Sequence, residues 1–131
     1  MKRYMIQTYA DLMKKFFNVE VSFKQKFQIQ TIEWSYYGQY SGGSRFYVVL
    51  PIRAGERLLV EIRKNPIERN KIKKLLKEWE QAVKTNDYEK YQQTITALFD
   101  LIVRNRVQIF REVMEGDTLK RIRVESKWDK R

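Results

Sequence analysis

Residues 45–84 read RFYVVLPIRAGERLLVEIRKNPIERNKIKKLLKEWEQAVK, and they contain the clearest signals of secondary structure in the chain. Its first half holds a run of apolar residues and then an alternation of apolar and polar residues, which are both typical of β-strands. We therefore expect strands over 45–52 and 57–63. Ala54-Gly55-Glu56 supplies a short turn between them, so the two strands are predicted to form a hairpin.

A helix is predicted directly after this hairpin. Asn65 is a favourable capping residue, and Pro66 suits the first helical position because its fixed backbone angle fits the first turn. Apolar residues then recur every three or four positions and give the helix one buried face. These residues are Ile72, Leu75, Leu76, Trp79, Ala82 and Val83.

A second helix is predicted after Thr85-Asn86-Asp87, which ends the first one. Its apolar stripe begins at Tyr88 and continues past Val107 to Met114, so we expect this helix to run to about Glu115. Alternatively, a strand begins at Val107.

The N-terminal part starts with apolar residues at helical spacing and changes to alternation at Val19. We expect a helix over 4–17 and two strands over 19–24 and 27–37; a single strand with a bulge near Thr31 is the alternative. Three of the five glycines lie in 38–44, which is therefore predicted to be a loop.

Together these elements predict an α+β fold in one domain over 1–131. The expected order is an N-terminal helix, a three- to four-stranded antiparallel sheet, two long amphipathic helices and a short basic C-terminal strand or arm. Segment 120–131 is expected to belong to that strand in part, or to form a mobile basic tail.

The composition indicates the class of partner. The chain has 27 Lys and Arg against 16 Asp and Glu, a formal net charge of +11, with 8 Tyr, 7 Phe and 3 Trp. A basic, aromatic chain favours a polyanionic partner, most often nucleic acid. We expect an intracellular protein without a signal peptide or membrane span. Few Gly and Pro residues and no Cys are typical of thermophiles and of small proteins from their viruses.

Three groups of residues are candidates for contacting nucleic acid. The first lies at the start of the predicted helix after Pro66, where cations would meet phosphates: Lys64, Arg69, Lys73, Lys74 and Lys77. The second surrounds the glycine-rich loop, where aromatic rings would stack on bases: Tyr37, Tyr40 and Arg45. The third is the C-terminal segment with Lys120, Arg121, Arg123 and Trp128.

Each group also has a structural explanation. The helix cations form an ordinary solvated face, the loop aromatics belong to the core or pair across strands, and Trp128 docks on its own domain. Both interpretations remain open at this point.

Catalysis is not expected. The chain has neither His nor Cys, so the nucleophilic triads and thiolate zinc sites that need them are excluded. No cofactor and no metal is predicted. The remaining alternative is a carboxylate-bound magnesium nuclease, for which Glu61 and the segment Glu125-Ser126-Lys127 are the candidate fragments.

The order of strands followed by a helix resembles the Whirly and transcription-coactivator single-strand binders. The segments that carry the resemblance are 27–37, 45–52, 57–63 and the helix after Pro66, about half of the chain. It implies a curved sheet that presents aromatic and basic residues, and a helix that mediates dimer packing. The lysine–glycine motif of that family is absent.

The sequence thus predicts a non-enzymatic nucleic-acid-binding protein, with DNA, RNA and strandedness left open. The alternatives are a viral or mobile-element factor that binds a host protein, and a virion nucleoprotein. A homodimer fits all three, because Tyr88, Tyr91 and Phe110 exceed what one small core is expected to bury.

Overall fold

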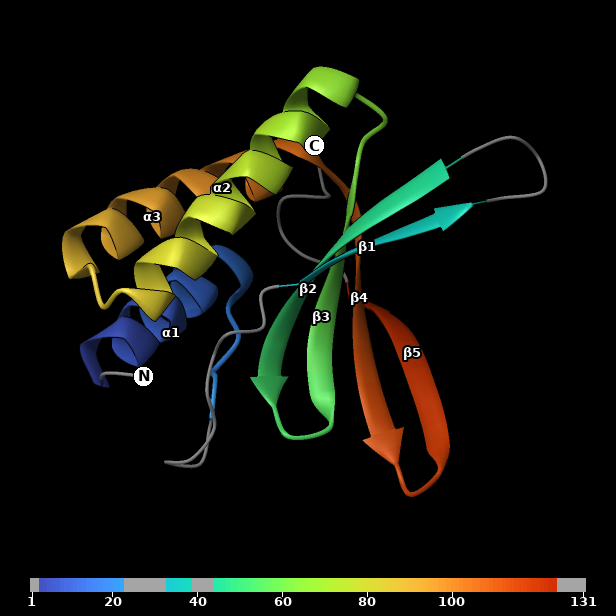
Figure 1. Cartoon of the computed structure of the whole chain (residues 1–131). Coiled ribbons are helices and arrows are strands. Elements are labelled where there is room, and N and C mark those ends of the chain that lie inside the picture. Colours follow the sequence, from blue (N-terminus) through green and yellow to red (C-terminus); the bar gives the residue numbers. More distant parts are fainter. Residues whose placement is uncertain (1–2, 23–32, 39–43, 125–131) are drawn as a thin grey trace.

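The computed structural model describes residues 3–22, 33–38 and 44–124 of the chain. The described part contains three α-helices and five β-strands (Figure 1). In chain order these are α1 (Arg3–Phe17), β1 (Glu33–Gly38), β2 (Ser44–Arg53), β3 (Glu56–Ile62), α2 (Pro66–Lys84), α3 (Tyr88–Asn105), β4 (Arg106–Glu115) and β5 (Thr118–Val124).

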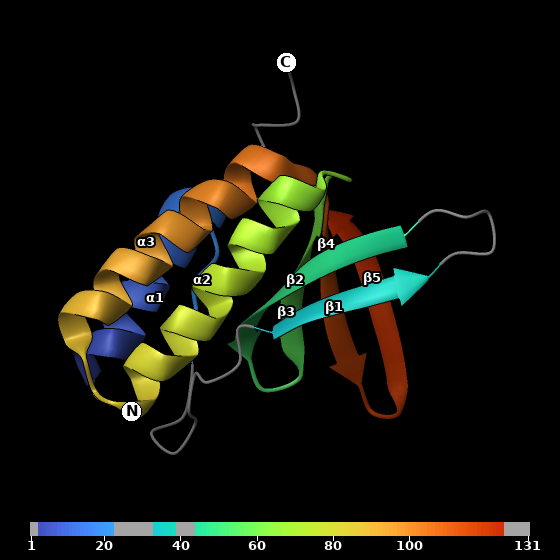
Figure 2. The ribbon, with the colours of Figure 1, turned by 45° about the horizontal axis from the view of Figure 1, so that its top comes forward.

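The five strands form one antiparallel sheet in the order β1-β2-β3-β4-β5. Strands β3 and β4 are neighbours in the sheet, although α2 and α3 lie between them in the sequence. The helices form a layer beside the sheet, with α2 and α3 antiparallel to each other (Figures 1 and 2). The molecule is therefore a strand meander with a helical hairpin inserted before its fourth strand.

The main core lies between the helix layer and one face of the sheet. Alternate residues of β2 and β3 point into it, which is the period-two pattern of a half-buried sheet. Phe99 of α3 is fully buried, and three rings of α1 surround it: Tyr9, Phe16 and Phe17, at centroid distances of 6.0, 6.1 and 6.0 Å. The second face of the sheet carries a smaller cluster of Tyr47, Val49 and Leu59.

The structure confirms the α+β class and most of the predicted elements. The hairpin over 45–52 and 57–63 corresponds to β2 and β3, with Gly55 in its turn at φ +78°. The predicted helix after Pro66 is α2, and its buried face contains Ile72, Leu76, Trp79 and Ala82. The short C-terminal strand is β5.

The long helix expected over 88–115 is wrong. Helix α3 ends at Asn105, and residues 106–115 form β4, which was the alternative. The reason is tertiary: β4 pairs with β3 from Glu56 to Ile62 and supplies that strand with a second hydrogen-bonded neighbour. Because this segment has apolar residues at both helical and strand spacing, pairing decides between the two.

The strand expected over 19–24 is also not found where the chain is described. Residues 18–22 are irregular, although Ser22 N–H donates to Ile52 O at 2.9 Å. Val19 is buried and Val21 packs against the core, so the predicted alternation of side chains is correct while the strand ladder is missing. Only the end of the strand predicted over 27–37 is described, as β1; the rest and most of the predicted loop lie outside the described residues.

Candidate nucleic-acid interface

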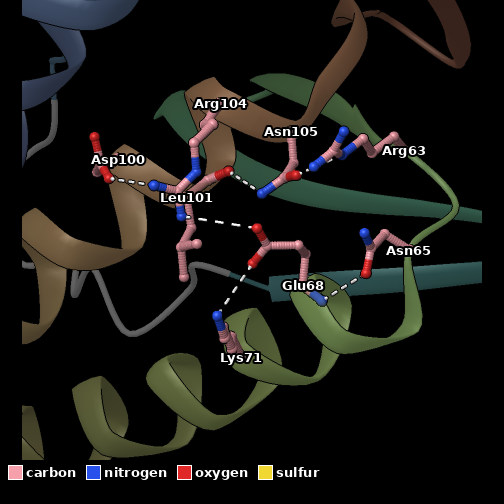
Figure 3. A network of polar contacts seen from close by, with 8 residues as sticks. All are labelled: Arg63, Asn65, Glu68, Lys71, Asp100, Leu101, Arg104 and Asn105. Carbon is pink, nitrogen blue, oxygen red and sulfur yellow. Dashed lines mark hydrogen bonds and ion pairs between the residues drawn. The ribbon is translucent and has the colours of Figure 1, made fainter.

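Eight cations belong to the segment between β3 and α2, to residues 66–77 of α2 and to the last turn of α3. We call this group the basic corner; its members are Arg63, Lys64, Arg69, Lys71, Lys73, Lys74, Lys77 and Arg104. Figure 3 shows the polar network beneath it, in which side chains from the start of α2 meet side chains from the last turns of α3.

The chain enters α2 through a capped first turn. Asn65 Oδ1 accepts a hydrogen bond from the backbone N–H of Glu68 at 3.1 Å, and Pro66 occupies the first helical position. Both features were predicted from the sequence. The cap fixes the direction in which the cations of the first turns of α2 point.

We expect Asn65→Ala to lower the free energy of unfolding by about 1 kcal/mol, because it removes the side chain that satisfies the first turn. Chemical denaturation followed by circular dichroism measures the change. Asn70→Ala, at an exposed position of the same helix, is the matched control. Equal effects of the two substitutions would show that the cap contributes nothing.

Asn105 forms hydrogen bonds with Arg63 that link the two ends of the helical hairpin. Arg63 donates twice to this residue, from its backbone N–H to Asn105 O at 2.8 Å and from Nε to Asn105 Oδ1 at 2.7 Å. The Asn105 side-chain amide donates to Leu101 O at 2.9 Å, and the residue is fully buried. The end of β3 is thereby held against the end of α3, which places Arg104 beside α2.

The only acid between Lys64 and Lys77 is Glu68, against six cations. Its side chain is only 15% exposed, and it points toward Lys71 Nζ and Arg104 Nη2, each at 3.8 Å (Figure 3). Arg104 also lies 3.5 Å from Asp100. Glu68 offsets the charge of the two cations that it faces, Lys71 and Arg104, and one carboxylate against six cations leaves segment 64–77 strongly positive.

The predicted helix cations divide into two kinds. Arg69 donates to Arg63 O at 3.1 Å and to Ile62 O at 3.0 Å, and its guanidinium lies 5.5 Å from the centre of the Phe46 ring. Lys73 Nζ lies at the same distance from that ring. Both residues thus have a structural role. Lys64, Lys74 and Lys77 are exposed, and none has an ion-pair partner within the part of the chain that the structure describes.

The predicted C-terminal cations lie elsewhere, on edge strand β5. Arg121 and Arg123 lie on the second face of the sheet, whereas Lys120 alternates to the first face and pairs with Glu115 at 2.9 Å. Arg121 binds the carboxylate of Glu112. The structure therefore places Arg121 and Arg123 on the face of the sheet opposite the helix group.

The predicted aromatic group is described only in its backbone. Tyr37 and Arg45 are Cα partners in the β1–β2 register. Their side chains, and Tyr40 and Trp128 entirely, lie outside the described residues, so their contact with bases stays a prediction. Tyr91, one of the rings expected to exceed a single core, is fully buried within the chain.

Glu61, the candidate magnesium ligand, accepts a hydrogen bond from Gln108 Nε2 at 2.8 Å. Over 3–22, 33–38 and 44–124, no three acidic side chains cluster in a way that would hold a metal ion. Glu125 lies outside these ranges. No helix within the same ranges is long and apolar enough to span a bilayer.

No family model, curated protein or solved structure matches this chain. Sequence reasoning missed Arg63, Arg104 and Asn105, which only the packing of β3 against the end of α3 brings together. One signal was present: Asn105 falls three positions after Ile102 on the apolar stripe of α3.

Proposed function

We propose that this protein is a non-enzymatic nucleic-acid-binding protein whose basic corner contacts backbone phosphates. The observation that carries the proposal is the six-to-one excess of cations over 64–77, with the single carboxylate turned inward. Cations bind phosphates with little dependence on sequence, so the sequence preference of the protein stays open. The proposal implies an intracellular location.

Helix electrostatics support this proposal. The first turns of a helix carry partial positive charge, so cations there are destabilising, by a few tenths of a kcal/mol each. The corner places Arg69, Lys71 and Lys73 in the first two turns of α2. The contacts of Arg69 and Lys73 with Phe46 and the ion pair of Lys71 with Glu68 offset part of this cost within the chain, and a bound polyanion would offset the rest.

The test is fluorescence anisotropy of labelled single-stranded DNA, double-stranded DNA and RNA across a range of salt concentrations. We expect the logarithm of the affinity to fall linearly with the logarithm of salt, with a slope of several units. The triple variant Lys64→Gln, Lys74→Gln, Lys77→Gln should weaken binding about tenfold and reduce the slope by about two units.

A charge-matched control is available elsewhere on the three helices. The triple variant Lys14→Gln, Lys84→Gln, Lys90→Gln removes the same charge from exposed positions outside the basic corner. It should leave the affinity within about twofold of the wild type. If both triples weaken binding equally, net charge and not the corner is responsible. If no nucleic acid binds at low salt, the proposal fails.

The β4–β5 hairpin favours one alternative, a factor that binds a host protein. Met114 and Leu119 are Cα partners on one face of this hairpin and are 48% and 51% exposed, and neighbouring exposed apolar residues are typical of a surface that pairs with another chain. A pulldown after nuclease treatment would recover a stoichiometric partner under this alternative. Sedimentation at equilibrium tests whether that partner is a second copy, and filament formation on long DNA tests a nucleoprotein role.

A further inference from the structure

Two consecutive residues of β4, Arg111 and Glu112, belong to two charged clusters on opposite faces of the sheet. On the first face, Glu56 accepts hydrogen bonds from Arg53 and Arg111. On the second face, Glu112 accepts hydrogen bonds from Arg57 Nε at 2.7 Å and from Arg121 Nη2 at 2.8 Å. Each cluster is one carboxylate held between two arginines, and each carries a net charge of +1.

The carboxylate of the second cluster positions its arginines. The Glu112 side chain is only 1% exposed, whereas those of Arg57 and Arg121 are 44% and 42% exposed. Each guanidinium has five N–H donors. Arg57 uses Nε, and Arg121 uses Nε and Nη2, on the same carboxylate. Both residues therefore have N–H donors that do not bind Glu112 and that lie at a half-exposed surface. Their hydrogen bonds to the buried Glu112 carboxylate fix their orientation.

Two neighbours distinguish the second cluster from the first. The Arg121 guanidinium lies 5.8 Å from the centre of the half-buried Phe110 ring, which holds its plane in a cation–π contact. Arg123 is the Cα partner of Phe110 on the same face, and it is exposed. With Arg123 the net charge of this surface rises to +2. We call Arg57, Glu112, Arg121 and Arg123 the sheet arginine site.

We propose that the sheet arginine site binds a phosphate group of a nucleic-acid strand, with Glu112 as a positioning residue. This inference rests on the proposed function for the source of the phosphate, but it concerns a second surface across the sheet from the basic corner. Arginine forks recognise phosphate oxygens through paired hydrogen bonds, and the N–H groups of Arg57 and Arg121 that do not bind Glu112 are donors of this kind.

The first test is NMR of the arginine Nε–Hε groups, titrated with an oligothymidine of eight nucleotides and separately with inorganic phosphate. We expect the signals of Arg57 and Arg121 to shift with the oligonucleotide and the signal of Arg111 to stay in place. A shift with inorganic phosphate alone would support the site and overturn the nucleic-acid function. No shift of Arg57 and Arg121 with either probe overturns the site.

The second test uses the cluster on the first face as an internal control. Arg121→Gln and Arg111→Gln each remove one guanidinium from an Arg–Glu–Arg cluster and change the net charge equally. We expect Arg121→Gln to weaken oligonucleotide binding about fivefold and Arg111→Gln to change it less than twofold. Equal losses overturn the site. If the α2 triple variant loses affinity for the oligonucleotide and Arg121→Gln does not, the proposed function is supported and the sheet arginine site is overturned.

The Glu112→Gln variant tests whether Glu112 acts by positioning the two arginines or only through its effect on the charge of the surface. The substitution makes the protein more positive by one charge, so a surface that acts only through its charge would bind the oligonucleotide more tightly. If Glu112 positions the two arginines, binding weakens instead, by about threefold. The measurement is made below the unfolding temperature of the variant, with the fold verified by circular dichroism.

Discussion

Phe99→Ala is expected to lower the free energy of unfolding by about 3–5 kcal/mol, the range for truncating a fully buried phenylalanine. The reason is that the Phe99 ring lies at the centre of the contact between α1 and α3. Phe99 is fully buried, and the rings of Tyr9, Phe16 and Phe17 all lie about it, so its removal opens a cavity at the contact between α1 and α3. The loss includes both the transfer of the ring to water and the cavity that remains.

Urea denaturation followed by circular dichroism and tryptophan fluorescence measures this effect. Thr96→Ala changes an exposed residue one turn earlier on α3 and should alter stability by less than about 0.5 kcal/mol. Hydrogen exchange adds a second readout, since α1 should lose protection before α2 does. A loss below 1 kcal/mol for Phe99→Ala would contradict the packing of α1 on α3.

Glu112→Gln is expected to cost about 2 kcal/mol at pH 7, because the variant loses hydrogen bonds between a buried carboxylate and two guanidinium groups. Desolvation by burial raises the pKa of Glu112, but the hydrogen bonds and charges of Arg121 and Arg57 outweigh it, and the net pKa lies below the ordinary value. A carboxyl with a lowered pKa in the folded state stabilises the fold at neutral pH. That contribution is lost as the pH falls through the folded-state pKa.

The pH dependence makes this prediction specific. The stability difference between wild type and Glu112→Gln should be full above pH 5 and should shrink at lower pH, as the wild-type carboxyl becomes protonated. Glu115→Gln is the control: its pair with Lys120 is exposed on both sides, so it should cost less than 0.5 kcal/mol. A difference that stays constant down to pH 2 would show that the charge of Glu112 does not stabilise the fold.

The sequence predicted the elements whose signals are local. Asn65 and Pro66 identified the start of α2, and alternation identified β2 and β3, since capping and period depend on neighbours in the chain. The end of α3 was not predictable in this way. Over 106–115 the segment contains neither Gly nor Pro, and its preference is settled by β3, which lies more than forty positions away.

The candidate site was predictable to a similar extent. A run of lysines is visible in the sequence, so Lys64, Lys74 and Lys77 could be named as candidates. The inward turn of Glu68 and the pairing of Arg57 with Glu112 depend on which strands are neighbours, and 55 positions separate the latter two residues. The nucleic-acid contacts of both groups remain predictions.

The junction of Arg63 with Asn105 has a consequence for how the chain folds. These residues are 42 positions apart, yet they lie at the two ends of the inserted helical hairpin and bind each other. Pairing β4 with β3 from an open chain would require closing that whole loop at once. Helices α2 and α3 are joined by a short turn and form from local contacts, which arise faster than distant ones. We therefore expect the helical hairpin to form early in refolding and to bring β4 close to the edge of β3. The pairing of β3 with β4 then no longer requires closure of a long open loop.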